Sequence, residues 1–146
     1  MKLESLFIAH IEGKGRSIFT NAPIAAETII EVAPVIVMSG DDRVHLDKTL
    51  LHDYIFEWGE KLDKCAVALG WVSLYNHAPL SNCEYIMDYE NDAIVIKTVK
   101  AINRNEELTI NYNGEYNDIK AVWFELKSWT VNWITTSSQV QQSYFS

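Results

Sequence analysis

Cysteine and basic residues are scarce in this 146-residue sequence, and each shortage excludes a class of protein. The two cysteines, Cys65 and Cys83, lack the paired spacing of a zinc ribbon or a disulfide scaffold, so we expect reduced thiols and a cytoplasmic setting. Twelve basic residues stand against twenty acidic ones. The resulting net charge of -8 disfavours nucleic acid and anionic membrane surfaces as partners and favours a Lys- or Arg-rich peptide.

Long apolar runs and several catalytic motifs are also missing. Lys2 and Glu4 interrupt the first residues, which predicts neither a signal peptide nor an anchor, and no stretch has the apolar length that crosses a bilayer. The sequence has no Gly-rich phosphate loop, no G-x-S-x-G elbow and no helical His pair with metal-ligand spacing. We therefore expect neither nucleotide hydrolysis nor a metal site.

Short strands dominate the patterns that are present. Hydrophobic residues make up 48% of the chain, enough for one packed domain. Strand patterns occur at 3–10, 17–20, 28–38, 84–89, 93–100 and 107–112, with Pro34 marking an edge or a break within the third. Residues 41–60 have the spacing of one or two short helices, and 119–133 that of an aromatic amphipathic helix. The sequence thus predicts a mainly β, α+β domain.

Three separated polar segments are candidates for a site. Glycines at 13 and 15 permit close backbone approach, and Asn76 and His77 lie at the end of an apolar segment. Tyr112 ends the last predicted strand, and Tyr116 follows four residues later. Each has an ordinary structural explanation as a turn, a cap or a packed ring. Cys83 and His77 are six residues apart, but a buried structural cysteine is a better interpretation than a thiol nucleophile. The order and spacing of the segments carry the functional signal.

These segments resemble the motifs of the SET domain, the fold of protein-lysine methyltransferases. Residues 76–82, NHAPLSN, resemble the family pattern N-H-S-x-x-P-N, and 105–112, NEELTINY, resemble G-E-E-[LI]-T-[IF]-x-Y. Residues 15–19, GRSIF, resemble G-x-G-V-F. DYIF at 53–56 and ALG at 68–70 resemble the minimal viral and bacterial members, which lack flanking zinc modules.

The resemblance implies a fold and a domain division. The fold would be a β-clip of short curved sheets with a C-terminal pseudoknot that brings Tyr112 beside Asn76 and His77. Residues 1–117 would form the SET domain, 118–135 an aromatic C-terminal helix and 136–146 a flexible tail. That helix would cover the lysine channel, form a homodimer face or simply pack on the sheet.

The resemblance also implies methyl transfer from S-adenosylmethionine to a lysine of a basic protein or peptide, in the cytoplasm or, in a eukaryotic host, the nucleus. This displacement depends on placement and on an uncharged amine, which an aromatic channel favours by desolvation. By similarity, the cofactor would be held by Lys14, Gly15, Arg16, Asn76, His77 and Tyr112. Tyr112 would lie beside the methyl group as a catalytic residue, with Tyr116 also assigned a catalytic role, and Tyr54 and Tyr116 would line the channel.

Several positions depart from the family pattern. Ser17 and Ala78 stand where the family has a glycine and a serine, and Pro79 comes two positions earlier than the family proline. Glu27 and Asn105 stand at two positions where the family has turn glycines. Because Asn76, His77 and Tyr112 all remain, these departures bear on cofactor affinity more than on fold. Two alternatives stay open: a catalytically degenerate SET fold that binds peptides or serves assembly, and an acidic aromatic interaction domain unrelated to SET.

Overall fold

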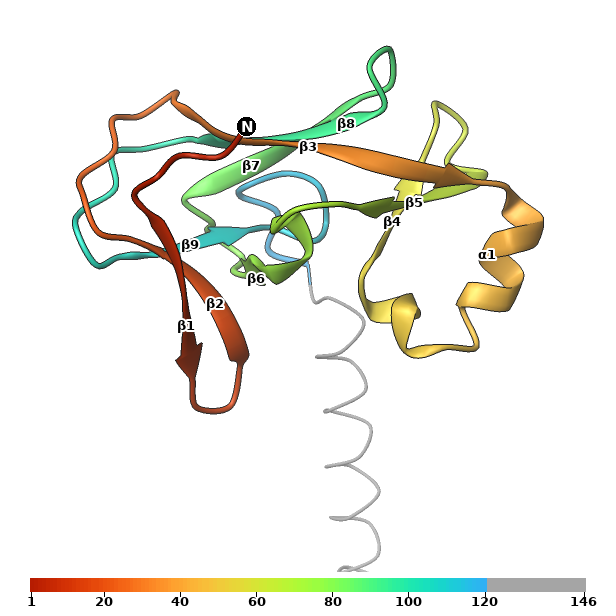
Figure 1. The fold of residues 1–146 in the computed structure, drawn as a ribbon, viewed down its shortest axis with the longest axis horizontal. Helices are drawn as coiled ribbons and strands as arrows, with labels where there is room; N and C mark the ends of the chain where they lie inside the picture. Colours follow the sequence, from red (N-terminus) through yellow and green to blue (C-terminus); the bar gives the residue numbers. More distant parts are fainter. Residues whose placement is uncertain (121–146) are drawn as a thin grey trace, which may run out of the picture.

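The computed structural model describes residues 1–120, in which short strands outnumber helices, as the sequence predicts. One sheet has the order β1-β2-β9-β6 and the other the order β4-β5-β3-β8-β7 (Figure 1). The strands are β1 (Leu6–Ile11), β2 (Gly15–Thr20), β3 (Ile29–Met38), β4 (Ile55–Trp58), β5 (Lys64–Ala68), β6 (Asn76–His77), β7 (Cys83–Asp88), β8 (Ala93–Thr98) and β9 (Glu107–Ile110). The helical segments are α1 (Gly40–Leu46) and the 3₁₀ turns η1 (Leu50–Asp53) and η2 (Val72–Leu74).

The predicted hairpin of 84–89 and 93–100 is confirmed as β7 and β8, which pair from Cys83↔Thr98 to Asp88↔Ala93. At the other end of the molecule, β1 and β2 form a second hairpin whose turn contains Gly13 and Gly15 (Figure 1). Both glycines have a positive φ, 82° and 81°, a backbone conformation that glycine adopts without strain. The hairpin turn therefore explains why this short segment is rich in glycine.

Pro34 does not end a strand but marks a change of partner within β3. Residues from Ile29 to Pro34 pair with β8, and residues from Val35 to Met38 pair with β5. Proline has no N–H group and cannot continue a ladder of donors, so it fits the position where one pairing stops and the next begins. The predicted break is thus a junction between two halves of the five-stranded sheet.

The region predicted as helical over 41–60 is only partly so. Ser39 caps α1 through a capping box with Asp42, and η1 follows, which confirms two short helices. Residues 55–58, however, form strand β4, so the prediction of helix there is wrong. Pairing with β5 and burial of Trp58, which is 3% exposed and packs edge-to-face on Tyr89, override the local helical spacing.

The chain closes on itself through the shortest strand. β6 pairs in parallel with β9, Asn76 opposite Thr109 and His77 opposite Ile110. The segment after β9 then bonds to the 78–82 loop: the Asn111 amide donates to the Pro79 carbonyl at 3.1 Å, and the Ser81 N–H donates to the carbonyl of residue 116 at 3.0 Å. The predicted pseudoknot is confirmed.

The predicted C-terminal helix and tail fall mainly on residues 121–146, which lie outside the described residues, so the domain limits stay a prediction. In residues 1–120 no helix has the length and apolar character to cross a membrane, and no group of three or more His, Cys, Asp or Glu side chains could hold a metal ion. The core of the described residues draws on both sheets and on η2, and it includes Ile18, Ile30, Val72, Tyr75, Ile94, Ile96, Leu108 and Ile110.

Candidate active site

Tyr112, just after β9, is fixed at both its ends by the segment around β6. Its hydroxyl donates to the Tyr75 carbonyl at 2.9 Å, and its N–H donates to His77 Nδ1 at 3.1 Å. The His77 and Tyr112 rings are 5.2 Å apart between centroids. The parallel β6–β9 pairing therefore brings together residues that are 33 to 37 positions apart in the chain.

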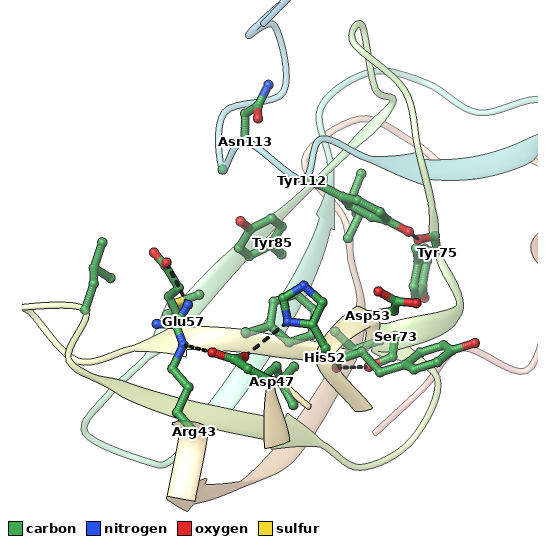
Figure 2. Close-up of a pocket in the computed structure, with 18 residues that line it drawn as sticks. Arg43, Asp47, His52, Asp53, Glu57, Ser73, Tyr75, Tyr85, Tyr112 and Asn113 are labelled. Atoms are coloured by element: carbon green, nitrogen blue, oxygen red, sulfur yellow. Dashed lines mark hydrogen bonds and ion pairs between the residues drawn. The ribbon is translucent and has the colours of Figure 1, made fainter. Parts of the chain in front are cut away.

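A cavity of about 620 Å³ opens beside Tyr112 (Figure 2). Its walls come from η1, β4, β7 and the chain after β9. Aromatic rings supply much of the lining, and Phe56 packs edge-to-face against Tyr85 with centroids 5.6 Å apart. The aromatic members of the lining are Tyr54, Phe56, Tyr75, Tyr85 and Tyr112. Polar and charged side chains, among them Arg43, Asp53 and Glu57, complete the lining, so the cavity combines apolar walls with a few polar groups, as ligand-binding sites commonly do.

The phenol of Tyr112 is held in its neutral form. Burial raises the pKa of Tyr112 to about 12, and the neighbouring phenol of Tyr54 adds to the increase. Because the carbonyl of Tyr75 accepts from this hydroxyl, the neutral phenol is also the form that the local hydrogen bond requires. The hydroxyl of Tyr112 is therefore both uncharged and oriented by its hydrogen bond to the Tyr75 carbonyl.

A second polar group joins the β1–β2 turn to β6. Glu107 accepts from the Asn76 amide at 3.0 Å and pairs with the Lys14 ammonium at 3.3 Å. The same Asn76 amide group donates to the hydroxyl of Ser17. Three segments that are far apart in the sequence thus meet around one carboxylate.

The remaining predicted site residues have mixed placements. Gly15 begins β2 at the turn, and Arg16 is exposed opposite His10 in the β1–β2 ladder. Tyr54 lines the cavity, whereas Tyr116 is not among the residues that line it and contacts Ser81 through its carbonyl. The structure therefore brings Tyr54 and Tyr112 together but does not add Tyr116 to them.

The departures from the family pattern also have structural counterparts. Glu27 and Asn105 have positive φ, 60° and 64°, at positions where the family has glycine. Ser17 does not have a positive φ, is fully buried and accepts from Asn76. Serine at this position therefore creates a hydrogen bond to the site and causes no backbone strain.

Sequence reasoning missed two carboxylates and one tyrosine of this region. Glu107 holds both Lys14 and Asn76, and Glu31 accepts from the hydroxyl of Tyr75 at 2.9 Å. Glu31 is the single charged residue in the apolar run 29–38, and a charge in such a run signals a buried partner. That signal was available from the sequence, but the identity of the partner was not.

Comparison with known proteins identifies the class. The SET domain family model matches residues 15–113, which include β2, the Asn76–His77 strand and Tyr112. The chain belongs to the SET-domain family of protein-lysine methyltransferases, and the predicted family and enzyme class are confirmed. The minimal viral or bacterial form stays a prediction.

One curated relative and two solved structures define the similarity further. The chain is 37% identical over 121 residues to the H3 lysine-37 specific histone-lysine N-methyltransferase of Schizosaccharomyces pombe, covering 82% of this chain and 77% of that protein. A candidate histone methyltransferase of Plasmodium falciparum has the same fold, with a TM-score of 0.59 and 21% identity over 84% of this chain and 98% of that one. An inhibitor-bound humanized mutant of Chaetomium thermophilum Polycomb Repressive Complex 2 matches with a TM-score of 0.63 and 19% identity, over 81% of this chain and 16% of that one.

Proposed function

We propose that this chain uses S-adenosylmethionine to methylate a lysine side chain in a basic histone segment. The observation that carries the proposal is the phenol of Tyr112, held by the Tyr75 carbonyl at the wall of an aromatic cavity and next to Asn76 and His77. A fixed hydroxyl between two ligand regions suits a reaction in which placement supplies most of the rate enhancement.

The residues on the β1–β2 side fit the cofactor. A Cβ added at Gly15 would meet no atom within 4 Å, so the turn has room for a ligand. The side-chain N–H groups of Asn76 donate to Ser17 and Glu107. Within residues 1–120 nothing donates to its side-chain oxygen Oδ1, so this oxygen suits the α-ammonium group of an amino acid. Lys14 offers the complementary cation for the carboxylate. The cofactor, when bound, supplies an electrophilic methyl group.

The residues on the cavity side suit the lysine. Tyr54, Phe56 and Tyr85 surround its aliphatic stem and exclude water, which lowers the pKa of a lysine amine from its reference value of about 10.4 and favours the uncharged nucleophile. The Tyr112 hydroxyl, already bound to a carbonyl, orients the nitrogen toward the cofactor side. Tyr116 stays a proposed channel residue on the family resemblance alone, because its ring is not part of the cavity lining and its contact with the Ser81 N–H is made by its backbone carbonyl.

Two separate arguments support a histone substrate. The relative from Schizosaccharomyces pombe is a histone H3 methyltransferase by name, and the net charge of -8 of this chain favours encounter with a Lys-rich tail. A histone substrate would imply a nuclear location.

The test pairs binding with transfer. Calorimetry should detect S-adenosylmethionine binding, and incubation with labelled cofactor and core histones should label a histone lysine. Tyr112→Phe should retain binding and lose transfer by about 100-fold, as expected when one oriented group is removed at the reaction centre. Tyr89→Phe is the matched control, because its exposed hydroxyl contacts Gly59 and lies outside the cavity lining.

The outcomes separate the candidate functions. Cofactor binding without transfer to any basic protein would favour a different substrate. Absence of both binding and transfer would reject the proposal and favour the degenerate SET fold that serves assembly. Equal losses in Tyr112→Phe and Tyr89→Phe would reject the assigned role of Tyr112.

A further inference from the structure

Glu31 is a buried carboxylate that the proposed mechanism does not use. It lies in β3, is 2% exposed and has its side chain directed at the turn η2. Carboxylates are seldom this buried unless hydrogen bonds compensate for the lost hydration. Burial raises the pKa of Glu31 above its ordinary value, against the opposing effects of the hydrogen bonds that it accepts.

The two donors to Glu31 are the two ends of η2. The Trp71 N–H, at the N-cap, donates to Oε1 at 2.7 Å, and the Tyr75 hydroxyl, at the C-cap, donates to Oε2 at 2.9 Å. A single 3₁₀ turn has few internal hydrogen bonds and no side-chain cap of its own in this structure. One carboxylate therefore holds both ends of a turn that has little independent stability.

The residues that follow this turn form the candidate site. The Tyr75 carbonyl accepts from the Tyr112 hydroxyl, and the next two residues pair with β9 as β6. Ala78 continues this contact, because its N–H donates to the Ile110 carbonyl at 3.0 Å. A displacement of η2 would therefore move the acceptor of the Tyr112 phenol and the cofactor strand together.

We propose that Glu31 is a positioning residue for methyl transfer, because its carboxylate fixes η2 and thereby sets the places of the Tyr75 carbonyl and of the strand Asn76–His77. This inference rests on the proposed function for its catalytic consequence. Glu31 acts from β3 behind the turn and is absent from the lining of the cavity. Its effect is on geometry, and it touches no reacting atom.

Two substitutions at Glu31 separate positioning from mere burial of a polar group. Glu31→Ala removes both acceptors and should lower kcat by about 10- to 100-fold, the range expected when a site shifts by an ångström. Glu31→Gln should stay within about 3-fold of wild type, because its amide oxygen accepts from Trp71 and its amide N–H donates to the Tyr75 hydroxyl oxygen. Recovery in Glu31→Gln is the result that a purely electrostatic role would not give.

The matched control is Thr98→Val, a buried polar residue on the neighbouring strand β8. The Thr98 hydroxyl donates to the Ala25 carbonyl at 2.8 Å and accepts from the Thr28 N–H at 2.9 Å, so this variant also loses buried hydrogen bonds. Its kcat should stay within about 2-fold of wild type.

Hydrogen exchange of the protein alone provides a readout that needs neither cofactor nor substrate. The Ala78 and Tyr112 amides, which bond across the β6–β9 junction, should exchange at least 10-fold faster in Glu31→Ala and should not change in Thr98→Val. If the wild-type protein transfers no methyl group, the proposed function fails, whereas the exchange rates still decide the positioning role.

If Glu31→Ala does not fold, the variant Tyr75→Phe provides the test instead. It removes one of the two bonds to the carboxylate and keeps the ring and the backbone carbonyl. We expect a 3- to 10-fold lower kcat and faster exchange of the Ala78 amide. The proposal is overturned if Glu31→Ala and Tyr75→Phe both have the exchange rates and kcat of Thr98→Val. If only Tyr75→Phe folds, the same result in that variant alone overturns it.

Discussion

Gly70 is the residue at which backbone conformation and the buried carboxylate meet most closely. Its φ is 80°, and an added Cβ would lie 2.7 Å from Oε1 of Glu31. Gly70→Ala should therefore lose about 1–2 kcal/mol of unfolding free energy for the left-handed conformation and a further 1–3 kcal/mol for overpacking. Urea denaturation monitored by tryptophan fluorescence measures both.

Gly13→Ala is the control, since Gly13 has a φ of 82° but nothing within 4 Å of an added Cβ. It should lose only the conformational part, about 1–2 kcal/mol. Equal losses of unfolding free energy in the two variants would mean that the carboxylate of Glu31 moves aside without an energetic penalty. In that case η2 is held less tightly than the distances indicate.

The pKa of Tyr112, raised to about 12 by burial, leads to a pH prediction. A phenol with a raised pKa stays neutral through the range in which an ordinary tyrosine, at about 10, would ionise. The rate of methyl transfer should therefore rise with pH as the lysine amine loses its proton, with no decline up to about pH 10.5. A falling limb near pH 10, under conditions in which circular dichroism reports an intact fold, would contradict this assignment.

Among the elements, β9 depends on a side chain for part of its pairing. Asn82, which is 5% exposed, donates to the Glu107 carbonyl at 2.7 Å and accepts from the Thr109 N–H at 2.8 Å. Asn82→Ala should cost about 2–4 kcal/mol, because it leaves one buried donor and one buried acceptor unpaired.

The exposed turn residue Asn91 is the comparison, because among the residues that the structure describes its side chain forms a hydrogen bond only to Asp88. Asn91→Ala should cost less than about 0.5 kcal/mol. Faster exchange of the Thr109 amide in Asn82→Ala, measured by NMR, would locate the damage in β9. A loss in Asn82→Ala no greater than in Asn91→Ala would show that water replaces the missing amide.

Elements with a strong local pattern were predictable, and those formed by distant partners were not. Val95 and its neighbours form a strand as expected, because Ile94, Val95 and Ile96 are consecutive β-branched residues that follow a tight turn. The sequence predicts helix where β4 lies, since Tyr54 and Ile55 continue the helical spacing of the leucines before them, and only the pairing of β4 with β5 decides the outcome. β6 has two residues, and no periodicity exists over so short a length.

At the level of the whole molecule, the candidate site follows the same division. Asn76, His77 and Tyr112 were predictable as a group because the resemblance to a family ordered them, and β6 and β9 place them together. Glu31 and Glu107 contact the site across 44 and 31 positions of sequence, and no local rule connects such residues. Their roles required the packed structure.

The net charge of the whole chain leads to the last prediction. A chain with a charge of -8 attracts a basic tail over a distance that salt shortens, so kcat/KM for a histone peptide should fall as ionic strength rises. Of the carboxylates that line the cavity, Asp53 should contribute most to attracting the peptide (Figure 2). Asp47 and Glu57 are already paired with Arg43, whereas Asp53 forms no ion pair within residues 1–120.

Asp53→Asn tests this contribution against an equal change of charge elsewhere. We expect KM for a Lys-rich peptide to rise about 3-fold and the salt dependence of kcat/KM to become shallower, since a cationic neighbour of the target lysine loses its nearest carboxylate. Asp92→Asn removes the same charge in the β7–β8 turn, where the φ of 46° suits asparagine, and should leave KM within about 1.5-fold. If both variants change KM equally, net charge alone attracts the substrate. If neither does, the acidic character of this domain serves solubility, and the basic segment is recognised by the shape of the cavity.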